Sequence, residues 1–189
     1  MKTLVLKKLT DEELVFNIIE TNNDDLFAEL YDRFSRVVYN KCYGFSKNKE
    51  EAEDLTHDVF IRLFVKLRTF KGNSKFSTWL YSFTYNFCVN YVQRNAYKKK
   101  ERITVVTDQI KDENVFDDID DAPLLELKSK KLAKVLTLID PTEKMILLMK
   151  YQDDMSIKEI MEALKIGESA VKMRVKRAKT KVLNLYDEL

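Results

Sequence analysis

The sequence predicts an all-α protein made of two small helical domains, an N-terminal helical bundle and a C-terminal helix-turn-helix, joined by a flexible acidic linker. Three glycines and two prolines in 189 residues are too few turn formers for a protein built of strands. Apolar residues recur every three or four positions along most of the chain, as on the buried faces of helices. We place the domains at residues 10–97 and 124–187, with the linker at residues 98–123.

The composition excludes several classes of function. The single histidine, His57, and the two cysteines, Cys42 and Cys88, cannot build a zinc site of four thiolate or imidazole ligands, and we expect both thiols to be buried. The chain has no glycine-rich phosphate loop and no nucleophile elbow, so we expect no catalysis, no metal and no cofactor. It shows neither a signal-peptide pattern nor an apolar run of spanning length, which favours a cytoplasmic protein without membrane insertion.

The charges are sorted along the chain although the net charge is only +2. Residues 94–102 carry five bases and one acid, residues 108–126 carry eight acids and one base, and residues 165–181 carry seven bases and one acid. Two basic segments separated by an acidic one indicate two modules that contact a polyanion, connected by a solvated tether.

Capping residues and breaks in the helical pattern mark four helices in the first domain. Thr10 and Glu13 form a capping box, and Asn48 with Glu51 marks a later helix start. Gly44 and the segment 71–74 interrupt the helical pattern. The four predicted helices span residues 11–21, 24–44, 48–70 and 77–95.

The third predicted helix carries two stripes of different character. Its core stripe consists of Leu55, Val59, Leu63, Leu67 and Phe70. The opposite face carries Asp54, Asp58, Ile61 and Val65, and we expect this face to be exposed. Two carboxylates one turn apart beside exposed branched aliphatics suit a protein partner that presents bases around an apolar patch. The alternative is an ordinary solvated helix face.

The fourth predicted helix lies in the most aromatic part of the chain. Phe76, Trp79, Phe83 and Phe87 have helical spacing and are interpreted as core. Tyr81 and Tyr85 are expected on another face, and the polar residues near them are Ser82, Asn86, Asn90 and the basic cluster that begins at Arg94. Aromatic rings and amides beside a positive groove are what unpaired bases require, so single-stranded DNA is the candidate ligand.

Helices resume at Leu124 in the second domain, with a break near Leu138. Asp140 and Pro141 mark a helix start, and Ser156 with Glu159 opens a short helix. The segment 165–167 turns the chain into a long helix whose apolar stripe is Val171, Val175, Ala178, Val182 and Leu185. Its other face carries Ser169, Lys172, Met173, Arg174, Lys176, Arg177, Lys179 and Lys181. This pattern is typical of a helix-turn-helix whose second helix enters the major groove of DNA, the alternative being a solvated surface helix.

These motifs together resemble a known family. Residues 52–60, AEDLTHDVF, followed by FKG at 70–72 and KFSTWLY at 75–81, are similar to the promoter-melting domain of sigma-70-type transcription initiation factors. Residues 140–181, with AVKMRVKRAK at 170–179, resemble the domain of those factors that reads the minus-thirty-five element. The short length, with nothing folded between the two domains, is similar to the extracytoplasmic-function (ECF) subgroup.

The resemblance implies a partner for each surface. Asp54 and Asp58 align with acids that dock on the beta-prime clamp helices of core RNA polymerase, and Ile61 and Val65 extend that surface. The loop that captures a flipped minus-ten base aligns with Phe70 to Lys75, so Lys71, Asn73, Ser74 and Lys75 are implied there. The melted strand would lie along Tyr81, Tyr85, Asn86, Asn90 and Arg94.

The resemblance also assigns the second domain and the linker. Ser169, Lys172, Met173 and Lys176 align with the face that enters the major groove, and Arg174 and Arg177 with phosphate contacts. The family further implies contact with the beta flap, a linker that threads the polymerase cleft, and inhibition by an anti-sigma factor. Polymerase itself makes the phosphodiester bonds, so the chain would be a binding subunit.

Two positions depart from the family pattern. His57 replaces the usual glutamine, and Ser82 with Phe83 replaces the tryptophan pair that housekeeping members carry on the melting helix. We therefore expect weaker melting and dependence on a strict promoter consensus. Run-off transcription from a library of minus-ten variants checks this expectation, and broad activity across the library would contradict it.

Two other classes of function remain open at this point. A helix-turn-helix regulator would bind duplex DNA without being a polymerase subunit, using the first domain for dimerisation or ligand sensing. A helical protein-protein adaptor would show no salt-dependent affinity for DNA. Co-purification with core polymerase separates the first of these from an initiation factor.

Overall fold

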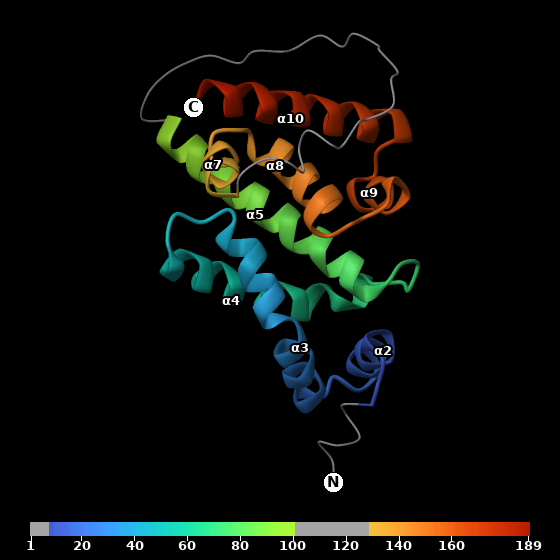
Figure 1. Ribbon diagram of the computed structural model, residues 1–189. Helices are drawn as coiled ribbons and strands as arrows, with labels where there is room; N and C mark the ends of the chain where they lie inside the picture. Colours follow the sequence, from blue (N-terminus) through green and yellow to red (C-terminus); the bar gives the residue numbers. More distant parts are fainter. Residues whose placement is uncertain (1–7, 101–128) are drawn as a thin grey trace. The chain divides into compact units, whose positions relative to one another are not determined.

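The computed structural model describes residues 8–100 and 129–189, and every regular element in these ranges is helical (Figure 1). They belong to two compact units, Met1–Asn90 and Tyr91–Leu189. The predicted all-α class with two helical domains is thereby confirmed. The acidic segment 108–126 and the helix start expected at Leu124 lie outside the described residues. Within these same ranges no helix is long and apolar enough to cross a bilayer.

The first two helices of the N-terminal unit are α2 (Asp11–Thr21) and α3 (Asp24–Tyr43). The capping box before α2 forms as predicted, with Glu13 N donating to Thr10 Oγ1 at 3.2 Å and Thr10 N donating to Glu13 Oε2 at 2.8 Å. Hydrogen bonds from the backbone and the side chain of Thr10 lower the pKa of the Glu13 carboxyl from its ordinary value. Asn22 caps the end of α2, and its left-handed backbone (φ 49°) turns the chain into α3, against which α2 packs.

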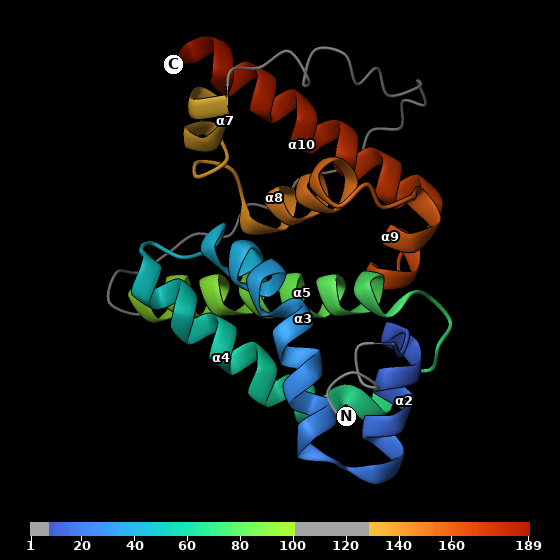
Figure 2. The same ribbon diagram turned by 60° about the horizontal axis from the view of Figure 1, so that its bottom comes forward.

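Helix α4 (Lys49–Lys66) packs along α3 and continues into a short 3-10 turn, η1 (Leu67–Thr69) (Figure 2). The predicted core stripe is confirmed, because Leu55, Val59, Leu63, Leu67 and Phe70 are all buried. The α-helix itself ends at Lys66, four residues before the predicted end. The 3-10 turn begins at Leu67 and Phe70 follows it in extended backbone, and both side chains are buried.

Helix α5 (Phe76–Lys100) begins one residue before the predicted start and runs beyond the predicted end. Its first backbone N–H, on Phe76, donates to Glu12 Oε1 of α2 at 2.7 Å, across 64 residues of sequence. The Phe76 ring is fully buried and lies 5.4 Å from both the Phe34 and the Phe70 rings, measured between centroids. These edge-to-face contacts join α3, the loop before α5 and α5 in one aromatic core.

The two cysteines are buried, as predicted, and face each other between α3 and α5. Cys88 Sγ lies 3.8 Å from Cys42 Sγ. The hydrogen bond to Cys42, together with burial, raises the pKa of the Cys88 thiol. Cys88 therefore stays protonated near neutral pH and acts as a packing residue.

The C-terminal unit contains α7 (Ser129–Val135), α8 (Pro141–Leu147), the π-helical turn η2 (Leu148–Gln152), α9 (Ile157–Leu164) and α10 (Glu168–Glu188). The predicted capping box at Ser156 forms, and the predicted helix start at Asp140 also has a capping box, with Glu143. Helix α10 packs on α7, α8 and α9 through the predicted stripe, of which Val171, Val175, Ala178 and Val182 are buried and Leu185 is partly exposed. Helix α7 ends at Val135, three residues before the predicted break.

The turn between α9 and α10 differs from the glycine turn that the sequence suggests. Lys165 is the residue with the left-handed backbone (φ 54°), and it ends α9. Gly167 has an ordinary φ of −71° and precedes the first residue of α10, where its missing side chain leaves that helix without a side-chain cap. A lysine rather than the glycine therefore bears the backbone strain of the turn.

Candidate nucleic-acid and protein interfaces

The exposed face of α4 matches the predicted stripe of acids and aliphatics. Asp54 and Asp58 are exposed, and Ile61 and Val65 expose 66% and 71% of their surface. The four residues follow one another at helical spacing on the side opposite the core stripe. Phe64, 38% exposed, borders them and packs edge-on against Phe27 of α3 at 5.0 Å between ring centroids. The result is an apolar surface with two carboxylates at one end, which suits a protein partner.

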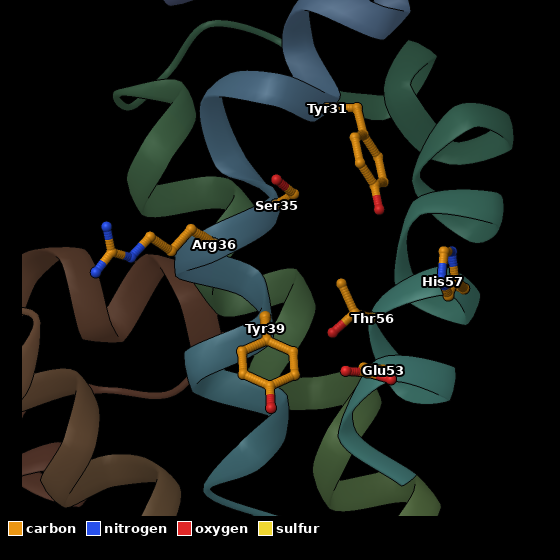
Figure 3. A pocket seen from close by; sticks show the side chains of 7 residues that line it. All are labelled: Tyr31, Ser35, Arg36, Tyr39, Glu53, Thr56 and His57. Carbon is orange, nitrogen blue, oxygen red and sulfur yellow. The ribbon is translucent and has the colours of Figure 1, made fainter. Parts of the chain in front are cut away.

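A pocket of about 220 Å³ lies between α3 and α4, beside this stripe (Figure 3). Sequence reasoning missed it, because it arises only where the two helices pack. Figure 3 shows the Arg36 side chain extending away from the pocket. The lining residues are Tyr31, Ser35, Arg36, Tyr39, Glu53, Thr56 and His57. His57 and Glu53 neighbour Asp58 and Asp54 in the sequence, so the pocket adjoins the α4 stripe.

The loop between η1 and α5 presents polar side chains next to a buried phenylalanine. Phe70 is only 3% exposed and anchors the loop, while Lys71, Asn73 and Lys75 are exposed and Ser74 is partly buried. Gly72 has a φ of +73°, a conformation that favours glycine. A Cβ at Gly72 would lie 3.1 Å from Cζ of Phe16 in α2, so the backbone also approaches that ring closely.

The exposed face of α5 carries most of the predicted strand-binding residues. Asn86, Asn90 and Arg94 are exposed, and Tyr81 is partly exposed. Tyr85 is not exposed at all, so the prediction that its ring is available to a base is wrong. Its hydroxyl lies 3.2 Å from Nζ of Lys41, a lysine of α3 that is itself only 2% exposed.

Lys41 is the reason why Tyr85 points inward. Its ammonium lies 4.0 Å from the ring centroid of Tyr81 and 4.7 Å from that of Tyr85. A buried cation requires hydrogen-bond acceptors and electron-rich rings to replace the water it has lost. The two tyrosines therefore hold α5 to α3, and only Tyr81 is also partly open to solvent.

Two further aromatic residues lie in line with the polar residues of α5. Trp79 and Phe83, interpreted from the sequence as core, are partly exposed and stack with 5.5 Å between centroids and 14° between planes. The order Trp79, Phe83, Asn86, Asn90 and Arg94 follows the three-four helical spacing, so these residues share a side of α5. The alignment of the pair with the polar residues Asn86, Asn90 and Arg94 was the available signal that this side of α5 reaches the surface.

Helix α10 presents the predicted polar face with two corrections. Ser169, Lys172, Arg174 and Arg177 are exposed, and Met173 and Lys176 are partly exposed. Lys179 is only 6% exposed, because it follows Val175 and Ala178 at the spacing of the packed stripe. Lys181 Nζ is held 2.8 Å from Glu143 Oε2 of α8. Lys179 therefore belongs to the packing of the unit, whereas Lys181 stays exposed and is held by its ion pair with Glu143.

Lys172 also has an ionic partner on its own helix. Its Nζ lies 2.7 Å from Glu168 Oε1 one turn earlier, and this hydrogen bond lowers the pKa of the Glu168 carboxyl. Both side chains are about half exposed, so the pair contributes little to stability. Its main effect is to hold the Lys172 ammonium at the start of the exposed face.

Comparisons with known proteins find relatives of both parts of the chain. Residues 30–97 match the family model for sigma-70 region 2, and residues 129–182 match a model for sigma-70 region 4. The chain is 33% identical to the ECF RNA polymerase sigma factor SigW of Bacillus subtilis over 173 residues, which cover 85% of this chain and 89% of SigW. It is 24% identical to SigX of the same organism, covering 88% of this chain and 86% of SigX.

Two solved structures share the fold. CnrH, solved in complex with the cytosolic domain of CnrY, superposes with a TM-score of 0.61 at 19% identity, covering 93% of this chain and 96% of CnrH. RpoE of Bartonella quintana, solved with the anti-sigma factor NepR, gives 0.60 at 15% identity and covers 85% and 96%. The sequence relationship to SigW and the two family models favour an initiation factor over a helix-turn-helix regulator that acts without polymerase. The chain therefore belongs to the sigma-70 family of RNA polymerase sigma factors, in its ECF group.

Proposed function

We propose that this sigma factor binds core RNA polymerase through the α4 stripe (Asp54, Asp58, Ile61 and Val65), which contacts the beta-prime clamp helices. Its second domain contacts the beta flap. The observation that supports this most is the exposure of Ile61 and Val65 beside two carboxylates on an otherwise well-packed helix. The protein supplies binding rather than catalysis and acts in the cytoplasm, where polymerase works. We assign the promoter-melting domain to residues 10–97 and the minus-thirty-five domain to residues 124–187.

The melted minus-ten strand would lie on the loop and on α5. Lys71, Asn73, Ser74 and Lys75 offer a polar rim for a flipped base, whose extrusion costs a few kcal/mol that binding must offset. Tyr81, Asn86, Asn90 and Arg94 continue along α5, and the stacked Trp79 and Phe83 add ring surface to this side. Tyr85 is no longer part of the proposal, because its ring is buried.

Duplex DNA at the minus-thirty-five element would meet α10. Ser169, Lys172, Met173 and Lys176 would face base edges in the major groove, and Arg174 and Arg177 would contact phosphates. An anti-sigma factor is a further proposed partner, supported by the NepR complex of the structurally similar RpoE. Protein from resting cells that elutes at its own mass in gel filtration would argue against such a partner.

Transcription with purified core polymerase tests the proposed function. Core enzyme and this protein are incubated with genomic fragments, and the 5′ ends of the transcripts are mapped. We expect a defined set of start sites that share two sequence elements and are absent with core alone. The same start sites with and without the protein would contradict the proposal.

The two tyrosines of α5 should respond differently to mutation. Tyr81→Ala removes a partly exposed ring and should weaken binding of holoenzyme to a single-stranded minus-ten oligonucleotide by about 1–3 kcal/mol, the usual value of one base stack. Tyr85→Phe removes a hydroxyl from buried Lys41 and should lower the free energy of unfolding by about 1–3 kcal/mol. Oligonucleotide affinity and thermal unfolding are measured for both variants. A Tyr85→Phe protein of unchanged stability with weakened DNA binding would reverse the two roles.

The basic residues of α10 should divide into two classes by the effect of their mutation on DNA binding. Lys172→Ala or Lys176→Ala should cost about 1–3 kcal/mol and relax the base preference at one position of the minus-thirty-five element. Arg174→Ala should weaken binding similarly on all sequences and reduce the slope of log affinity against log salt by about one. Affinities for single-base variants at several salt concentrations separate these outcomes. A change of promoter preference in Arg174→Ala would contradict the assignment.

A further inference from the structure

Helix α2 contacts both ends of the loop that is proposed to capture the base (residues 70–75). Figures 1 and 2 both show α2 beside the start of α5. At the end of the loop, Glu12 Oε1 accepts a hydrogen bond of 2.7 Å from the backbone N–H of Phe76. At the beginning of the loop, the Phe16 ring lies 5.8 Å from the Phe70 ring, centroid to centroid. In the middle of the loop, a Cβ added to Gly72 would lie only 3.1 Å from Cζ of Phe16.

The contact of Glu12 fixes where α5 begins. The first N–H groups of a helix have no partner within the helix, and a carboxylate there both accepts a hydrogen bond and interacts favourably with the helix dipole. Helix α5 receives this acceptor from α2 rather than from its own preceding residues Ser74 and Lys75. The side chains of the loop therefore remain available at the surface, and the position of the loop's last residue depends on α2.

The contact of Phe16 limits how the loop can fold. Phe16 is 46% exposed, and its ring neighbours the Phe70 ring and the Gly72 backbone. The Gly72 backbone, at φ +73°, passes against its edge, so the loop cannot collapse toward α2. Lys71 and Asn73 flank this glycine and are exposed on the rim.

Helix α2 is itself anchored to the bundle. Arg33 of α3 donates from Nη1 to Leu9 O and to Asp11 Oδ1, both at 2.9 Å, and from Nε to Glu29 Oε1 at 2.9 Å. These charge-assisted bonds fix the guanidinium plane and tie the start of α2 to α3. The connection from bundle to loop thus runs from Arg33 through Asp11 to Glu12 and Phe16.

We propose that α2 is a positioning element for base capture, in which Glu12 and Phe16 hold the loop in the shape that discriminates the flipped minus-ten base. Neither residue touches the base. Helix α2 ends at Thr21, before residue 30 where the match to the region 2 model begins. The inference rests on the proposed function of the loop and adds to it the part of the chain that sets its shape.

The test measures base discrimination directly. Holoenzyme affinity is determined for two single-stranded minus-ten oligonucleotides that differ only at the captured base, and the ratio of the two dissociation constants is the readout. Glu12→Ala and Phe16→Ala should each lower this ratio about fivefold to tenfold, the size expected for losing one hydrogen bond or one packing contact. The affinity for core polymerase and the preference at the minus-thirty-five element should stay within about twofold of the wild type.

Matched variants show whether the effect comes from the loop contacts. Glu12→Gln retains an acceptor oxygen and should keep most of the discrimination, and Glu20→Ala removes an exposed carboxylate of α2 that has no role in the proposal. Glu12→Ala carries the test by itself if Phe16→Ala does not fold. Unchanged ratios in Glu12→Ala and Phe16→Ala, or equal weakening for both oligonucleotides, would overturn the inference.

A loop variant distinguishes this failure from failure of the proposed function. Asn73→Ala should lower the discrimination ratio if the loop captures the base. If Asn73→Ala lowers the ratio and the α2 variants do not, only the positioning role is wrong. If the wild-type protein discriminates no base at this position, the proposed function of the loop is wrong as well.

Discussion

Reversing the charge of both acidic residues of the α4 stripe, in the double variant Asp54→Lys with Asp58→Lys, should abolish holoenzyme assembly while leaving the protein folded. Both side chains are exposed, so the substitution disturbs no core contact. At a protein interface, a like-charge contact in place of an ion pair costs several kcal/mol, and two such changes should weaken core binding by about 100-fold or more. The dissociation constant is measured by anisotropy of labelled protein titrated with core polymerase.

Two other exposed carboxylates provide the control. Glu20→Lys with Asp32→Lys changes the net charge equally, on α2 and α3, away from the stripe. This control should bind core within a few-fold of the wild type at physiological salt, where exposed charges are screened beyond about 8 Å. Equal loss of binding in both double variants would indicate a general charge effect and would contradict the assignment of the α4 stripe. Ile61→Asp tests the apolar part of the same surface and should also prevent binding.

Truncation of Phe76 should have the largest effect on stability. The side chain is 0% exposed, and its ring lies within 5.9 Å of the ring centroids of Phe34, Phe70 and Trp79. Removing a buried phenyl ring typically costs about 3–5 kcal/mol, since the cavity collapses only partly. Phe76→Ala should therefore lower the melting temperature by about 10 °C or more, as followed by circular dichroism.

An exposed aromatic residue serves as the comparison for this variant. Tyr43, at the end of α3, exposes 56% of its surface, and Tyr43→Ala should change the free energy of unfolding by about 1 kcal/mol or less. A Phe76→Ala protein as stable as Tyr43→Ala would mean that the aromatic core joining α3, the loop and α5 does not form as described. Because Phe76 also begins α5, its loss should further reduce minus-ten binding.

Features encoded within a few residues of sequence were predictable. The capping boxes at Thr10 and Ser156 form with the expected partners three residues later, and the helix start predicted at Asp140 is confirmed. The exposure of Ile61 and Val65 followed from the three-four period of the opposite core stripe, because helix geometry fixes which residues share a face. The exposed bases Arg174 and Arg177 were placed by the same argument.

Features that depend on a distant partner were not predictable. Tyr85 has the spacing of an exposed residue, yet it turns inward because buried Lys41 lies on another helix. The start of α5 depends on Glu12, 64 residues earlier. Lys179 was misplaced for a different reason, since its charge suggested exposure while its position after Val175 and Ala178 put it on the packed stripe.

Site-specific crosslinking within one holoenzyme–promoter complex tests the central claim most directly. A photoreactive group is placed at Asn86 of α5 in one preparation and at Ser169 of α10 in another, both of them exposed positions. We predict that Asn86 marks the non-template strand of the minus-ten element and Ser169 the duplex minus-thirty-five element, each only when core polymerase is present. Labelling of a single element from both positions, or identical labelling without core, would contradict a sigma factor that holds polymerase and two promoter elements at once.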